Sequence, residues 1–120
     1  MTRARIELGK AAEQAAECYL SRKGFRILER GWRTRFGEVD IVALDGDTLV
    51  FVEVKARRGG GFGPAESAVD ARKQLRIAKT ALAYLQRRPH DGPVRFDVVA
   101  LQEGAVRHIQ GAFEADGWTR

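Results

Sequence analysis

Four charged residues interrupt two apolar stretches of the sequence, and their types could support metal-dependent chemistry. Glu38 and Asp40 lie in the first stretch, and Glu53 and Lys55 lie in the second. Burying a charged side chain is costly unless it is paired or bound to a metal. Carboxylate oxygens are the ligands that Mg²⁺ and Mn²⁺ prefer, and a nearby lysine could activate a metal-bound water or neutralise a reacting phosphate. The chemistry therefore depends on whether the fold brings these side chains together.

The turn between the two stretches predicts how they pair. Asp45-Gly46-Asp47-Thr48 is typical of a hairpin turn, since glycine readily adopts positive φ. Pairing the two ends of this turn places Asp40 opposite Glu53 and Glu38 opposite Lys55. Residues that face one another across a ladder share a face of the sheet. All four charges are therefore expected on one face, at the end away from the turn, and the opposite face is wholly apolar.

This arrangement predicts a divalent metal site. Opposed Cβ atoms lie about 5 Å apart, and two carboxylates at that distance repel unless they share a cation or a proton. We expect Asp40 and Glu53 to bind Mg²⁺ or Mn²⁺, Lys55 to assist, and Glu38 to support the site as the partner of Lys55. The alternative is an ordinary salt-bridge cluster with Asp40 turned to solvent, although the apolar flanks weigh against it. A one-residue slip would separate the faces.

Two helices and five strands are expected to position these residues. Helix formers fill residues 8 to 23, where Ala12, Ala16, Tyr19 and Leu20 form one apolar stripe. A second helix is expected over 69 to 87, with Leu75, Ala78, Leu82 and Leu85 on its apolar stripe. Strands are expected at 25 to 35, 38 to 45, 48 to 56, 94 to 102 and 105 to 110. The order predicts an α/β domain with one mixed, five-stranded sheet flanked by helices.

The chain as a whole is consistent with a single soluble domain. Its 120 residues form one unit, 1–120, with a glycine-rich loop at about 57–67 and a C-terminal tail at about 111–120. No apolar run is long enough to span a membrane and no secretory signal is visible, so a cytoplasmic location is expected. The formal net charge of +5 is compatible with a polyanionic partner but does not require one.

The segment "GEVDIV" followed by "FVEVKAR" resembles the core of the PD-(D/E)xK nuclease superfamily. Its spacing and flanks are most similar to the YraN-type family of small bacterial endonuclease-like proteins, which resembles archaeal Holliday-junction resolvases. The resemblance extends to "LGKAAEQAAECYL", to "GFGPAESAVDARKQLRIAKTALAYL" and to "RFDVVAL", and so covers most of the chain. It implies a restriction-endonuclease-like fold and a Mg²⁺-dependent endodeoxyribonuclease. Because resolvases act as dimers, it also implies a homodimer.

The resemblance assigns roles to individual residues. Asp40 and Glu53 match the metal-binding carboxylates, Lys55 matches the lysine that assists the attacking water, and Glu13 holds the position of a helical glutamate that often completes the site. A solvated carboxylate remains the alternative for Glu13. The chain departs from the usual pattern at Val39, where the superfamily often has proline, and at Gly31, where asparagine is usual.

Basic residues next to the proposed site are candidates for DNA contacts. Lys73 and Arg76 match positions that are typically basic in the YraN-type family and are the first choices. The others are Arg72 and Lys79 on the second helix, and Arg57 and Arg58 beside the glycine-rich loop. A solvated helix face is the alternative reading of this stripe. His90 and His108 lack the spacing of a metal-binding pair, and neither is assigned a role.

Two functions from different classes follow. The leading hypothesis is a metal-dependent endonuclease that acts on branched or structured DNA. The alternative is a nucleic-acid-binding module that keeps a nuclease fold with little or no turnover. The intact set of Asp40, Glu53 and Lys55 favours the enzyme. A structural subunit of a larger DNA-processing assembly is a third option, supported by size alone.

Overall fold

The computed structural model describes residues 3–57 and 69–114, and its elements follow the predicted order. They are α1 (Arg3–Arg22), β1 (Arg26–Thr34), β2 (Gly37–Asp45), β3 (Thr48–Arg57), α2 (Ala71–Arg87), β4 (Val94–Gln102) and β5 (Ala105–Phe113). The α/β class and the five-stranded sheet are thereby confirmed. None of the helices in these residues is long and apolar enough to cross a membrane.

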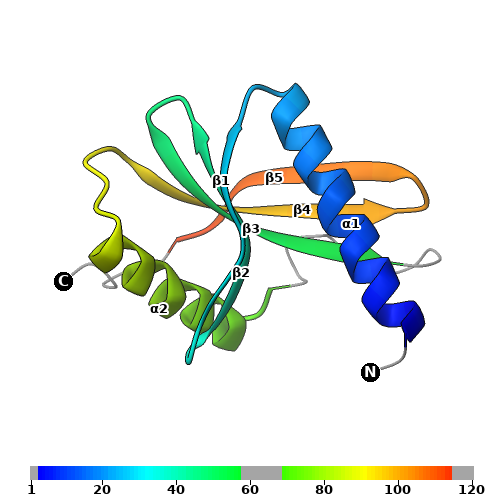
Figure 1. Ribbon diagram of the computed structural model, residues 1–120, viewed down its shortest axis with the longest axis horizontal. Helices are drawn as coiled ribbons and strands as arrows, with labels where there is room; N and C mark the ends of the chain where they lie inside the picture. The colour runs from blue at the N-terminus through cyan, green and yellow to red at the C-terminus, as the bar shows by residue number, and fades with distance from the viewer. Residues whose placement is uncertain (1–2, 58–68, 115–120) are drawn as a thin grey trace.

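The sheet has the strand order β1-β2-β3-β4-β5 (Figure 1). Strands β3 and β4 pair in parallel, and the other neighbouring strands pair antiparallel. A parallel pair needs a crossover connection, and α2 lies in the segment that connects β3 to β4. The mixed sheet is therefore a direct consequence of placing one helix between two hairpin-connected groups of strands.

Each helix packs on its own hydrophobic core. The α1 core contains Ala16 and Leu20 of the helix, as predicted, together with Phe25, Ile41, Ala43, Val50, Val52 and Val99. The α2 core contains Ile77, Ala81 and Tyr84 of that helix, together with Val39, Val42, Leu49, Phe51, Val69, Phe96 and Val98. Strands β2 and β3 contribute to both cores, so the central hairpin is buried on its two faces, as its apolar sequence predicts.

The predicted apolar stripe of α2 is confirmed only in part, since Ala78 is buried and Leu85 packs against the α2 core. The residues that the helix buries are Ile77, Ala78, Thr80, Ala81 and Tyr84, whereas Leu75 is 57% exposed. Two apolar stripes run along this helix, and periodicity alone cannot choose which of them faces the sheet. The helix also begins later than predicted, because Asp70 is its N-cap and accepts a hydrogen bond from the backbone N–H of Lys73 at 2.9 Å.

Strand β5 is longer than predicted and ends at Phe113 instead of residue 110. A register irregularity between Phe96 and Val98 lets the chain continue past Gly111, which has a φ of +62° and donates its N–H to Asp97 at 3.0 Å. Phe113 then stacks on Phe96. Two predicted segments lie outside the described residues. They are residues 115–120 of the tail and nearly all of the glycine-rich loop, including Arg58.

Candidate active site

The β2–β3 hairpin has the predicted register from its turn as far as the charged residues. Asp45 pairs with Thr48 across Gly46, whose φ is +60°, and the ladder continues in the same register to Ile41 and Val52. The assigned pairing ends there. One residue beyond it, the Asp40 carboxylate accepts a hydrogen bond from the backbone N–H of Val54 at 2.8 Å. The side chain of Asp40 thus takes up a backbone donor just where the ladder stops.

Two predicted details of this hairpin are wrong. Val39 packs in the α2 core and Ile41 packs in the α1 core, so the strict alternation of β2 is broken at Asp40. The predicted pairing of Glu38 with Lys55 is also absent. Glu38 instead accepts a hydrogen bond from Nε of Arg33 at 3.2 Å, across the β1–β2 ladder.

Asp40 is a largely buried carboxyl group in an acidic surrounding. Its pKa is raised to about 7, first by burial and then by the charge of Glu53, with smaller contributions from Glu13 and Glu38. The hydrogen bond from Val54 opposes this shift. No ion pair joins Asp40 to a cation within the described residues. The carboxylate of Asp40 is therefore an oxygen ligand whose negative charge is poorly neutralised by the protein.

Glu53 is more deeply buried than Asp40, and two lysines approach it. Its side chain is 9% exposed, and Nζ of Lys73 and Nζ of Lys55 lie 3.0 Å and 3.6 Å from its Oε1 atom. Burial lowers the pKa of Lys55, and the neighbouring Lys73 lowers it further. For Lys73, burial acts to lower the pKa, but contact with Lys55 and the charge of Glu53 outweigh it and raise the pKa. Lys73 comes from α2, so this helix supplies part of the site.

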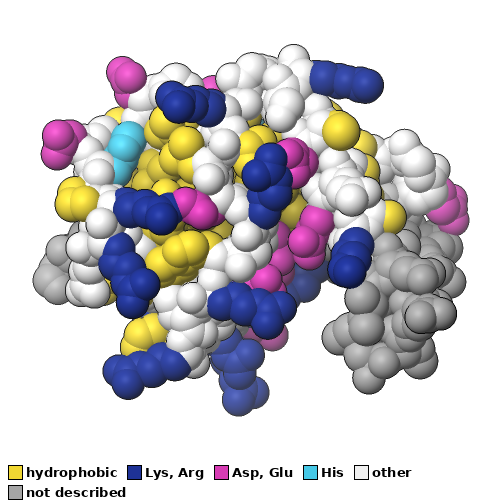
Figure 2. All heavy atoms as spheres, viewed as in Figure 1, with side chains coloured by type: hydrophobic (Ala, Val, Ile, Leu, Met, Phe, Trp, Pro, Cys, Tyr) yellow, Lys and Arg dark blue, Asp and Glu magenta, His cyan; other side chains and the backbone are white. Residues whose placement is uncertain are grey.

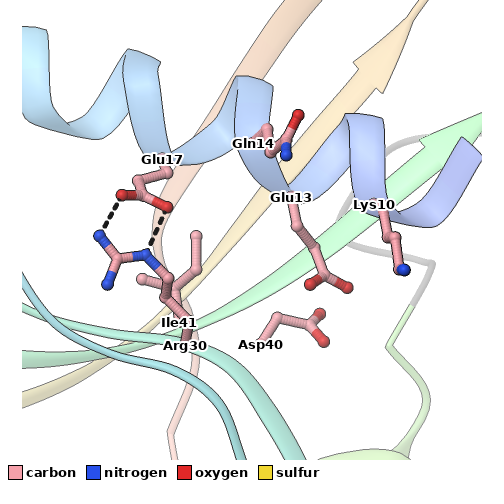
Figure 3. Close-up of a pocket in the computed structure, with 7 residues that line it drawn as sticks. All are labelled: Lys10, Glu13, Gln14, Glu17, Arg30, Asp40 and Ile41. Carbon is pink, nitrogen blue, oxygen red and sulfur yellow. Dashed lines mark hydrogen bonds and ion pairs between the residues drawn. The ribbon is translucent and has the colours of Figure 1, made fainter. Parts of the chain in front are cut away.

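Helix α1 supplies a third carboxylate. In Figure 3 the carboxylates of Glu13 and Asp40 point toward one another across a pocket between α1 and β2. Burial raises the pKa of Glu13, the charges of Glu38 and Glu53 raise it further, and Arg33 opposes them. At the other end of the pocket Glu17 accepts a hydrogen bond from Nε of Arg30 at 2.7 Å. Figure 3 thus contrasts Glu17, which is paired with Arg30, with Glu13 and Asp40, which face one another.

These residues fit a hard divalent cation held mainly through its own waters. Among residues 3–57 and 69–114, no three His, Cys, Asp or Glu side chains are close enough to form a complete ligand cage. Mg²⁺ does not need one, because it commonly binds through one or two carboxylates and keeps several water ligands. The buried Asp40 carboxylate accepts one hydrogen bond from the described part of the chain. Its remaining lone pairs are oxygen donors of the kind that such an ion prefers, although Glu13 and Glu53 do not lie close enough to join it in a three-ligand site.

The comparisons with known proteins place the chain in a family. The model of the uncharacterised protein family UPF0102 matches residues 12–101. The chain belongs to the UPF0102 family. The predicted resemblance to YraN-type proteins is thereby confirmed, since UPF0102 is the YraN family. The matched segment contains every carboxylate and lysine of the cluster just described.

Several UPF0102 relatives match nearly the whole chain. The UPF0102 protein of Thermodesulfovibrio yellowstonii is 47% identical over 92% of this chain and 98% of its own length. That of Pseudomonas putida is 52% identical over 88% of this chain and 92% of its own length. A third, from Rhodococcus opacus, is 45% identical over 90% of this chain and 97% of its own length.

The basic residues predicted to contact DNA separate into two groups in this UPF0102 chain. Arg72, Arg76 and Lys79 are exposed on α2, whereas Lys73 turns inward to Glu53. Arg57 is the last residue of β3. Lys and Arg side chains gather in the lower part of Figure 2, over α2 and the end of the β1–β2 hairpin, with acidic side chains beside them. The predicted stripe thus lies on the surface, and its binding of DNA stays a prediction.

Sequence reasoning missed the position of Lys73 and the network around Asp97. Lys73 was recognised as basic, but nothing in its spacing indicates that α2 aims it at Glu53. Asp97 is 1% exposed and bonds Arg95 and His108, although His108 was assigned no role. A charged residue in the centre of the apolar run "VRFDVVAL" was the available signal, and it has the same form as the signal that singled out Asp40.

Proposed function

We propose that this UPF0102 protein is a metal-dependent endonuclease that hydrolyses phosphodiester bonds in DNA, with branched or structured DNA as its substrate. The observation that carries the proposal is the partly buried Asp40 carboxylate, which faces Glu13 across the pocket, lies within the influence of the Glu53 charge and has no ion-pair partner among the described residues. Such a cluster is unfavourable in the metal-free protein. A bound divalent cation would neutralise it, and the likeness to PD-(D/E)xK nucleases supplies the reaction class.

Each residue of the cluster has a role in this proposal. Asp40 and Glu53 would hold Mg²⁺ or Mn²⁺, and Glu13 would add negative charge from α1. The bound ion supplies Lewis-acid activation of water and of the phosphate. Lys55, whose pKa is lowered by burial and by Lys73, is suited to accept or position a proton of the attacking water. Glu38 acts at a distance by adding negative potential around Glu13 and Asp40.

The exposed cations of α2 supply the attraction for the substrate. Arg72, Arg76 and Lys79 lie on the helix that also directs Lys73 into the carboxylate cluster. Contacts between such cations and phosphates are insensitive to sequence and weaken with added salt. A DNA backbone that follows this helix would pass close to the carboxylates.

One observation favours the second function, a nucleic-acid-binding module without efficient turnover. The ammonium of Lys73 lies 3.0 Å from Glu53 and already neutralises one of the carboxylates that the endonuclease would use for metal. In the binding module this ion pair is permanent. In the endonuclease Glu53 would instead hold the metal ion, and Lys73 would be available to contact a phosphate.

Cleavage assays on defined DNA distinguish these two functions. Four-way junction, forked, single-stranded and duplex DNA are incubated with the protein in Mg²⁺ or Mn²⁺, alongside Asp40→Asn and Lys55→Met. Glu17→Gln is the matched control, because it removes a carboxylate of the same pocket that is already paired with Arg30. The endonuclease should cut at least one of these DNAs, and each of the two site variants should lose about 100-fold or more of the rate.

Each outcome of the cleavage assay has a different interpretation. Cleavage that survives in Asp40→Asn would assign the activity to a contaminant and overturn the proposal. Binding without any cleavage in either metal would establish the binding module instead. Glu17→Gln should retain the wild-type rate, and its loss would mean that the whole pocket, not the Asp40 cluster, determines activity.

A further inference from the structure

The turn between β1 and β2 presents an aromatic side chain to solvent. Phe36 is 39% exposed, and it is one of three large hydrophobic residues that are exposed in the described part of the chain. A single exposed apolar residue needs no explanation by itself. The surroundings of Phe36 distinguish it, because two cations lie over its ring and its backbone N–H is hydrogen-bonded to Thr34.

The turn is fixed to α2. Thr34 accepts a hydrogen bond from the backbone N–H of Phe36 at 3.1 Å, and its hydroxyl oxygen lies 3.5 Å from that of Thr80 on α2. Gly37 has a φ of +151°, and a Cβ atom there would come within 3.6 Å of the Thr80 hydroxyl. The tip of the hairpin therefore lies against the side chains of Thr80 and Arg76 on α2. An anchored turn presents Phe36 in a defined position, as a binding surface requires.

Two cations accompany the ring. The guanidinium carbon of Arg35 lies 5.0 Å from the ring centroid of Phe36, and Nζ of Lys79 lies 5.9 Å from it. Both distances are within the range of cation–π contacts. Arg76, which is exposed, passes beside Gly37. A flat aromatic surface beside several cations matches a ligand that carries flat rings on an anionic backbone, which is the description of a single nucleic-acid strand.

Phe36 lies a short distance along the chain from the Asp40 carboxylate. Strand β2 leads from Gly37 through Glu38 to Asp40. Four residues from Phe36 to Asp40 span about 13 Å at the rise of a β-strand, which corresponds to about four base pairs of B-form DNA. A base held on Phe36 would therefore lie a few nucleotides from a phosphate at the Asp40 cluster.

We propose that Phe36, flanked by Arg35 and Lys79, is a stacking site for an unpaired base, so that the protein selects DNA in which bases are unpaired next to a duplex. This inference rests on the proposed endonuclease function and narrows its substrate. A base in an intact duplex is already stacked on its neighbours, whereas a base at a fork or a branch point can stack on the ring. The phosphates on either side of that base then lie next to Arg35 and Lys79.

Binding measurements on Phe36 variants test the stacking site. Affinities for forked DNA and for the matching duplex are measured by fluorescence anisotropy in the cleavage-deficient Asp40→Asn background. Phe36→Ala should bind forked DNA about 5- to 100-fold more weakly, the range expected for losing one stacked base, with little change on duplex. Phe36→Trp should retain the wild-type affinity. Val106→Ala is the control, because it truncates another exposed apolar side chain with the same exposed fraction of 39%.

A fluorescent adenine analogue at the unpaired position adds a direct readout of stacking. Its emission should be quenched by protein with Phe36 or Trp at this position and should stay unquenched with Phe36→Ala. An equal loss of affinity for forked and duplex DNA, or no loss at all, would overturn the stacking site while leaving the endonuclease intact. A wild-type protein that binds neither DNA would overturn both.

Discussion

Two aspartates in the same sheet differ in their hydrogen-bond partners, and their pKa values are shifted in opposite directions. Asp97 on β4 accepts four hydrogen bonds from the described residues, namely two from Arg95, one from His108 and one from the N–H of Gly111. Burial acts to raise its pKa, but these bonds outweigh burial and the pKa is lowered. Asp40 on β2 accepts one hydrogen bond, from Val54, and its pKa is raised to about 7.

The number of hydrogen-bond partners separates Asp97, a structural carboxylate, from Asp40, whose carboxylate keeps lone pairs that the described residues do not use. The partners of Asp97 hold the irregular β4–β5 pairing, and His108 in turn packs edge-on against Tyr19 of α1 and against Phe25. Asp97 therefore connects β4, β5 and the end of α1. Asp40 has other carboxylates around it and makes the folded protein less stable when it is ionised. Burial alone therefore does not distinguish the two aspartates, whereas the number of hydrogen-bond partners does.

The largest change in stability is expected from the removal of the Asp97 side chain. Asp97→Ala would remove the acceptor of the buried His108 ring and of the N–H of Gly111, and it would leave Arg95 with Asp45 alone. We expect a loss of about 3–5 kcal/mol in the free energy of unfolding. Urea denaturation followed by circular dichroism measures this loss. A loss of less than about 1 kcal/mol would mean that the network around Asp97 contributes little to stability. Asp97 could then no longer be regarded as a structural residue.

Removal of the Asp40 charge is expected to stabilise the protein, in contrast to the loss of stability in Asp97→Ala. Asp40→Asn keeps the acceptor for the N–H of Val54 and removes the charge, so in metal-free buffer at about pH 8 it should stabilise the protein by about 1–3 kcal/mol. The folded-state pKa of about 7 lies above the value expected in the unfolded chain. The contribution of Asp40 to stability is therefore fully present below about pH 4 and is lost as the pH rises through 7.

The advantage of Asp40→Asn should consequently shrink as the pH is lowered from about 8 to about 5. Thermal denaturation of both proteins at several pH values, with a chelator present, measures this trend. Asp97→Asn is the matched control, since it should be less stable than the wild type at about pH 8. An Asp40→Asn protein that is less stable than the wild type throughout would show that Asp40 is a structural residue like Asp97.

The smallest effect is expected at Lys73. Its side chain is partly exposed and pairs with Glu53, so Lys73→Met should cost only about 1 kcal/mol of stability. If Lys73 competes with metal for Glu53, the same variant should bind Mn²⁺ more tightly than the wild type in calorimetric titration. Weaker Mn²⁺ binding would instead mean that Lys73 helps to position Glu53 for the metal.

Much of the fold and the centre of the site followed from local chemistry. The turn at Gly46 determines the hairpin register, and the register brings Asp40 close to Glu53. What could not be predicted depends on long-range geometry. The rotation of α2 about its axis decides that Lys73 faces Glu53 while Leu75 faces solvent. The register of β1 against β2 places Glu38 opposite Arg33. The partners of Asp97 come from separate parts of β4 and β5, and no short motif joins them.

The most direct test of a metal role for the Asp40 cluster is the thermal stability of the wild-type protein with and without excess Mn²⁺ at about pH 8. A ligand that binds only the folded state at about 100 times its dissociation constant stabilises by about 2.7 kcal/mol. We expect Mn²⁺ to raise the melting temperature of the wild type and of Glu17→Gln by several degrees, and to leave that of Asp40→Asn unchanged. A wild-type melting temperature that does not respond to Mn²⁺, or a response that persists in Asp40→Asn, would contradict the account.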